Sequence, residues 1–141
     1  MGQILDKPIT EKYNDSNCRQ GIRYGLSSMQ GWRPSMEDDH SALISIPTLG
    51  NNISWFAVFD GHNGSNISSH CSSHLLEAII SNKTFVEAVE KQMQLSTEEF
   101  KKKVTDGIIS AFLQFDKMMQ HGKEILIKNP RSSGGLSLIH I

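Results

Sequence analysis

The sequence predicts an α+β fold in which strands in the first half of the chain are followed by helices in the second half. Short apolar runs between polar turn residues precede residue 60, as is typical of buried strands. From residue 65 onward, apolar residues recur at four-residue spacing, which places them on one face of a helix. The 141 residues, 38% apolar and 21% charged, suffice for one globular core.

Strands are expected over residues 22–30, 40–46 and 53–59. The last one ends in a wholly apolar run, Trp55 to Phe59, which predicts a buried strand with Asp60 directly after it. Gly61 comes next, and because it lacks a Cβ atom its carbonyl can approach an ion closely where the chain turns. A polar side chain at the end of a buried strand is expected to face a site rather than open solvent.

Helices are expected in the rest of the chain. The first begins near Ser65 and has an apolar face made of Ile67, Cys71, Leu75 and Ile79. Capping-box spacings, Thr84 with Glu87 and Ser96 with Glu99, mark the starts of two more helices. The last helix should end near Gly122, and Gly107 weakens it modestly. Its core-facing residues are expected to be Val104, Ile108, Phe112, Phe115 and Met119.

Charge and cysteine content exclude several classes of protein. A net charge of −1 gives no electrostatic signal for nucleic acid. Two cysteines are too few for a disulfide framework, so a reducing compartment is expected. No apolar run is long enough for a transmembrane segment, and the first residues lack the blocks of a signal peptide. We therefore expect cytoplasmic localisation, with the nucleus as an additional compartment.

Gly2 is a candidate for myristoylation, which uses this glycine after removal of Met1. The motif favours Ser or Thr at the sixth position, where this chain has Asp6. One acyl chain would give only weak and reversible membrane contact, and no polybasic stretch reinforces it.

His70 and His74 lie one helical turn apart beside Cys71, a spacing that superficially suggests zinc. A structural zinc site needs about four ligands, and no fourth partner is evident. We therefore interpret the histidines as a solvated pair.

Two polar clusters lie at the boundaries of apolar runs. Residues 32–40 supply Arg33, Glu37 and Asp38, and residues 55–64 supply Asp60 and His62. Carboxylates are the ligands that Mg²⁺ and Mn²⁺ prefer, and a guanidinium matches phosphate oxygens. A histidine titrates near neutrality and can protonate a leaving alkoxide. Together these are the parts needed to hold divalent cations beside a phosphate.

The sequence after Phe59 also has a simpler interpretation. Asp60 and Gly61 alone fit a polar turn between a strand and a helix. The presence of two clusters that jointly contain Arg, acids and His favours the functional interpretation.

Residues 21–76 resemble the amino-terminal part of the metal-dependent protein phosphatases of type 2C. The matching stretches run from Arg23 to Arg33, from Met36 to Asp38 and from Phe56 to Gly64. The first eight residues resemble the start of the animal alpha and beta forms of this family.

The resemblance implies a protein serine/threonine phosphatase that uses two Mg²⁺ or Mn²⁺ ions and a metal-activated water. Asp60 would bridge the ions, the Gly61 carbonyl would bind one of them, and Glu37 and Asp38 would hold metal-bound waters. Arg33 would bind the substrate phosphate, and His62 would protonate the departing serine or threonine oxygen. The implied substrates are phosphorylated proteins, and the full-length enzyme is expected to be a monomer.

The family fold is an α-β-β-α sandwich of two mainly antiparallel sheets flanked by helices, of which only the amino-terminal part would be present. Residues 1–20 would form an amino-terminal extension, and residues 21–135 the amino-terminal part of the catalytic domain. The family's other metal ligands lie in an Asp-Gly and an Asp-Asn motif, whereas Asp106 and Asp116 here lie in a helical pattern. We therefore expect the chain alone to be inactive and poorly soluble. The alternative is a non-catalytic truncated isoform that acts as a binding or regulatory fragment.

Residues 136–141 are expected to be a non-native tail. Leu136 to Ile141 are the residues that the codons CTG TCT CTT ATA CAC ATC would encode, and this nucleotide sequence is the reverse complement of a transposase end sequence used in sequencing libraries. The stretch would then be translated adapter. A genuine alternative carboxyl terminus is the competing interpretation.

Overall fold

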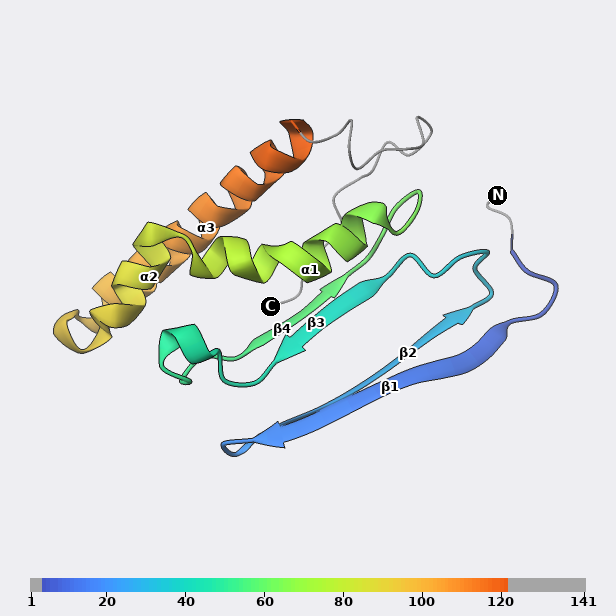
Figure 1. The fold of residues 1–141 in the computed structure, drawn as a ribbon, viewed down its shortest axis with the longest axis horizontal. Coiled ribbons are helices and arrows are strands. Elements are labelled where there is room, and N and C mark those ends of the chain that lie inside the picture. The colour runs from blue at the N-terminus through green and yellow to red at the C-terminus, as the bar shows by residue number, and fades with distance from the viewer. Residues whose placement is uncertain (1–3, 122–141) are drawn as a thin grey trace.

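A computed structural model describes residues 4–121 of the chain and places them in successive layers (Figure 1). A hairpin of β1 (Ile9–Arg19) and β2 (Ile22–Gly31) lies on one side, and the antiparallel pair β3 (Asp39–Leu43) and β4 (Trp55–Phe59) lies in the middle. The other side is covered by α1 (Asn66–Ile80), α2 (Lys83–Glu90) and α3 (Thr97–His121). Short 3-10 helices, Pro47–Leu49 and Gln92–Gln94, lie in the connections. This arrangement confirms the predicted α+β class and is consistent with the amino-terminal part of the expected sandwich.

Strand β4 has one buried and one exposed face, because side chains alternate along a strand. Trp55, Ala57 and Phe59 are buried against the helices. Phe56 and Val58 point the other way and are 36% and 53% exposed. The prediction of a buried strand is therefore correct for the face of β4 that packs on the helices and wrong for its other face.

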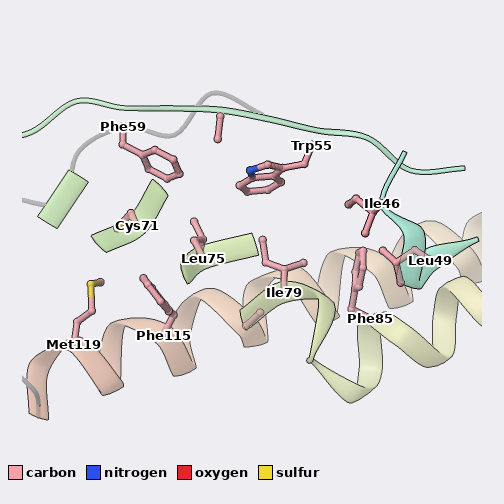
Figure 2. Packing of buried hydrophobic residues seen from close by; sticks show 12 residues of the cluster. Ile46, Leu49, Trp55, Phe59, Cys71, Leu75, Ile79, Phe85, Phe115 and Met119 are labelled. Atoms are coloured by element: carbon pink, nitrogen blue, oxygen red, sulfur yellow. The ribbon is translucent and has the colours of Figure 1, made fainter. Parts of the chain in front are cut away.

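The core lies between β4 and the three helices, and Figure 2 shows its members from each element. Trp55 and Phe59 face Leu75 and Ile79 of α1, and α3 closes the far side. Burial of each large apolar side chain contributes about 1.5–3 kcal/mol. The predicted helix faces are confirmed, with these residues buried: Cys71, Leu75, Ile79, Phe115 and Met119. The remaining predicted positions are partly buried against the core: Ile67, Val104, Ile108 and Phe112.

The predicted start of α3 is confirmed and that of α2 is corrected. The Ser96 amide donates to Glu99 Oε2 at 3.1 Å, while the Glu99 amide lies 3.3 Å from Ser96 Oγ, which is a reciprocal capping box. Helix α2 is instead capped by Asn82, whose Oδ1 accepts from the Phe85 amide at 3.2 Å. Thr84 lies inside the first turn of α2 and is not its cap.

Gly107 lies where α3 crosses α2. A Cβ atom at this position would lie 2.6 Å from the Phe85 backbone nitrogen. The glycine therefore permits close contact between the two helices. This contact explains why a glycine occupies a position inside a helix, where its helix propensity is unfavourable.

Strand β1 was not predicted, since the first strand expected from the sequence begins at residue 22. The strand is joined to β2 by a two-residue turn in which both Gln20 and Gly21 have positive φ, 51° and 79°. These angles are typical of a type I′ hairpin turn. The hairpin contacts the middle sheet through two ring pairs with 5.6 Å between centroids, Tyr13 with His40 and Tyr24 with Phe56.

Several predictions concern residues outside the described range. Gly2, Gly122 and the tail at 136–141 all lie there, so the predicted lipidation, helix stop and adapter remain predictions. Within residues 4–121, no helix combines the length and the apolarity that a membrane crossing requires.

The 141-residue chain, expressed alone, is expected to aggregate or to be partly unfolded. Its sheets expose large apolar side chains, namely Ile9, Tyr13, Ile22, Met29, Phe56 and Val58. Such faces and the edges of two-stranded sheets favour association with other chains. Size-exclusion chromatography and a thermal melt followed by circular dichroism provide the measurement. A monomer with one sharp cooperative transition would contradict this expectation.

Candidate metal and phosphate site

The antiparallel register of β3 and β4 brings the two polar clusters together. Asp39 pairs with Phe59 at the end of the ladder. Because the strands are antiparallel, the residue before Asp39 and the residue after Phe59, Asp38 and Asp60, are neighbours just beyond this end. They contribute to a pocket of about 480 Å³ that is lined by all six predicted site residues: Arg33, Glu37, Asp38, Asp60, Gly61 and His62. The structure therefore brings together every site residue that was predicted within the described range.

Arg33 and Glu37 form a loose ion pair at the edge of this pocket. Their Nη2 and Oε2 atoms are 3.9 Å apart, and Glu37 Oε1 also accepts a hydrogen bond of 3.1 Å from Ser35 Oγ. The Glu37 side chain is only 18% exposed, whereas the Arg33 side chain is 72% exposed. A long and exposed ion pair stabilises the fold little. The guanidinium therefore remains accessible to an anion.

Gly61 is required by the close approach of two loops. A Cβ atom on Gly61 would lie 2.2 Å from the Glu37 carbonyl oxygen and 3.0 Å from the Gly64 carbonyl oxygen. Any side chain would push the loop that carries Asp60 and His62 away from the segment that carries Glu37. The glycine thus sets the distance between the two halves of the site.

Asp60 and His62 are exposed at the mouth of the pocket. Asp60 Oδ1 and His62 Nδ1 are 3.8 Å apart, which is beyond the range of a hydrogen bond. The side chains are 61% and 56% exposed, respectively. Neither group is held by the other, so both can contact a bound ion or substrate.

Two serines of α1 that the sequence analysis did not single out contact the first cluster. Ser68 Oγ lies 2.5 Å from the Glu37 carbonyl oxygen, and Ser72 Oγ lies 2.8 Å from Asp39 Oδ2. A four-residue spacing of hydroxyls on a helix was the available signal, but it is too common to indicate such contacts without the structure.

The donor groups suit a hard divalent cation in type but not in number. The carboxylates of Asp60, Glu37 and Asp38 and the carbonyl of Gly61 offer only oxygen, which Mg²⁺ and Mn²⁺ prefer. Among residues 4–121, however, no three His, Cys, Asp or Glu side chains are close enough to hold one metal ion. These residues fit one part of a metal site, and further ligands would have to come from elsewhere.

The packing of the histidine pair on α1 corrects one part of its interpretation as a solvated pair. The His70 ring stacks on His74 with 4.4 Å between centroids and on Phe115 with 5.4 Å. Partial burial, and secondarily the neighbouring His74, lowers the pKa of His70. The prediction of a solvated pair is correct for His74 and wrong for His70, which packs between α1 and α3.

Comparison with known proteins covers most of the chain. Residues 22–140 match the family model described as "Protein phosphatase 2C". The chain is 46% identical to protein phosphatase 1B of Mus musculus over 125 residues, which cover 89% of this chain and 32% of that protein. It is 44% identical to protein phosphatase 1A of Homo sapiens over 120 residues, 85% of this chain and 30% of that protein.

The chain thus spans about a third of the length of these curated relatives. Their similarity covers both polar clusters and the helices that follow, and the family model extends across most of the 141 residues. These matches show that the chain belongs to the metal-dependent protein phosphatase 2C family.

Proposed function

We propose that this chain is the amino-terminal part of a catalytic domain that hydrolyses phosphoserine and phosphothreonine in proteins. The observation that carries the proposal is the pocket in which Arg33, the acids and His62 converge. An accessible guanidinium beside a set of carboxylates suits a phosphate ester bound together with divalent cations. The family match supports the same reaction class.

The residues of this chain would have separate roles. Asp60 and the Gly61 carbonyl would hold two Mg²⁺ or Mn²⁺ ions, and Glu37 and Asp38 would orient their waters. When bound, such ions supply a water nucleophile that is active at neutral pH. Arg33, which is 72% exposed, would bind and orient the phosphate of the substrate.

His62 would donate a proton to the leaving serine or threonine oxygen. An alkoxide is a poor leaving group, so proton delivery to this oxygen lowers the barrier. The imidazole is 56% exposed and lines the same pocket as Arg33, so it can contact the ester oxygen of a bound substrate.

A second candidate function applies to the 141-residue chain by itself. Because the described residues contain no group of three metal-binding side chains, a chain of this length would bind substrates or regulators without turnover. The first candidate requires a longer gene product that supplies the remaining ligands.

Removal of metal is expected to abolish hydrolysis by the full-length protein. With a phosphothreonine peptide and Mn²⁺, phosphate release should stop when EDTA is added and resume when excess Mn²⁺ is restored. The 141-residue chain, assayed in parallel, should release no phosphate above background. Chelator-resistant hydrolysis, or activity confined to phosphotyrosine, would contradict the proposed function.

Localisation in the cytoplasm or nucleus, the monomeric state of the full-length protein and lipidation of Gly2 stay predictions. Mass spectrometry of the amino-terminal peptide would settle the lipidation. A myristoylated Gly2 adds the mass of one acyl chain, and an unmodified peptide would contradict the prediction.

A further inference from the structure

We propose that Ser68 and Ser72 of α1 are positioning residues that hold the acidic segment Glu37–Asp39 at the site. This inference rests on the proposed function and adds two residues that neither polar cluster contains. The two serines are four residues apart and therefore lie on the same face of the helix. Each places its hydroxyl against a different atom of the segment.

Ser68 clamps the backbone of Glu37. Its side chain is almost completely buried, with 3% of the residue exposed. Its Oγ lies 2.5 Å from the Glu37 carbonyl oxygen and 3.0 Å from the Ser65 carbonyl oxygen, and a hydroxyl has only one proton to donate. The hydroxyl therefore lies between the two carbonyl oxygens and links the first turn of α1 to the Glu37 backbone.

The same carbonyl is also close to Gly61. The space that a Gly61 Cβ atom would need is occupied by the Glu37 carbonyl oxygen, 2.2 Å away. Ser68 and Gly61 together fix the orientation of the peptide group between Glu37 and Asp38. The direction of the Asp38 side chain follows from this orientation, and Asp38 is the neighbour of Asp60 across the sheet.

Ser72 anchors the third acid of the segment. Its Oγ lies 2.8 Å from Asp39 Oδ2, and Asp39 Oδ1 accepts from the His40 amide at 2.8 Å. Both carboxylate oxygens of Asp39 are therefore engaged within the fold. This explains why Glu37 and Asp38 line the 480 Å³ pocket, whereas Asp39 does not.

Helix α1 is a rigid support for these contacts. The side of the helix that carries the two serines also packs in the core, where Leu75 is 1% and Cys71 is 6% exposed. Side chains that orient metal-binding groups work best from such a fixed element. The two hydroxyls thus tie the acidic segment to a helix whose own position is fixed by the core.

The test uses Ser68→Ala and Ser72→Ala in the full-length phosphatase, with Ser73→Ala as the matched control. Ser73 lies on the same helix and has a similar hydrogen bond, 2.9 Å from its Oγ to the Ser69 carbonyl, but it is exposed. Mn²⁺ affinity is measured by electron paramagnetic resonance of the free ion. Amide exchange of residues 37–40 reports the order of the segment.

We expect Ser68→Ala and Ser72→Ala each to weaken Mn²⁺ binding by about tenfold, the lower end of the range for loss of a residue that supports metal ligands. Exchange at residues 37–40 should rise, and excess Mn²⁺ should restore turnover because the loss lies in affinity. Ser73→Ala should match the parent in all three measurements. The less buried Ser72 provides a second variant if Ser68→Ala does not fold.

Mn²⁺ affinities equal to that of the Ser73 control would overturn the positioning role, and so would a loss of turnover that excess Mn²⁺ does not restore. A parent protein that neither binds Mn²⁺ nor hydrolyses phosphothreonine would instead overturn the proposed function. The two failures are distinguishable, since the first appears in the variants of an active parent and the second in the parent itself.

Discussion

Replacement of Asp60 by alanine in the full-length protein is expected to nearly abolish the proposed hydrolysis at every pH and to leave the fold intact. The side chain is 61% exposed, so its removal creates no cavity in the core. As the proposed bridging ligand, its loss should lower turnover by more than the roughly 10–100-fold that loss of a supporting residue typically costs. Initial rates with a phosphothreonine peptide at saturating Mn²⁺ provide the measurement.

Two further variants separate the charge of Asp60 from its shape and from nonspecific effects. Asp60→Asn keeps the shape of the side chain and removes its charge, so it should be almost as inactive as Asp60→Ala. Asp106→Ala removes the same charge from α3, where the carboxylate pairs with Lys102 at 2.6 Å. This exposed helix pair contributes only about 0.2–0.5 kcal/mol, so turnover should stay near that of the parent. Normal turnover by Asp60→Asn would exclude a metal-binding role for the carboxylate.

The candidate site could be predicted because its residues lie in two short segments at the ends of strands. Asp60 follows an apolar run, and the sequence alone places it at the end of β4. The pairing of Asp39 with Phe59 then brings the other segment alongside. This pairing was not predicted from the sequence, since strand partners depend on long-range packing rather than on local pattern.

Features that depend on contacts between distant segments were missed. Strand β1 is a largely polar sequence without the apolar alternation that indicates a strand. Its one local signal is the Gln20–Gly21 turn, because glycine suits a position with positive φ. The contact of Gly107 with Phe85 and the hydroxyl contacts of α1 likewise become visible only in three dimensions.

Replacement of His62 by glutamine should lower turnover of a phosphothreonine peptide by about 10²–10⁴-fold, the usual contribution of a general acid. Glutamine cannot deliver a proton to the threonine oxygen, and Mn²⁺ binding should be unchanged because His62 is not among the proposed ligands. The loss should be much smaller with p-nitrophenyl phosphate, since nitrophenolate leaves without protonation. Rates of the parent and the variant on both substrates, at saturating Mn²⁺, provide the measurement.

The comparison of substrates isolates proton transfer from every other role of His62. A defect in folding, in metal binding or in phosphate binding would slow both substrates alike, whereas loss of a general acid slows only the one with the poor leaving group. His74→Gln is the matched control, because His74 is an exposed histidine on α1 whose Nδ1 lies 3.0 Å from the His70 carbonyl. It should leave both rates unchanged. Equal losses on the peptide and the nitrophenyl ester in the His62 variant would assign His62 to positioning rather than to proton transfer.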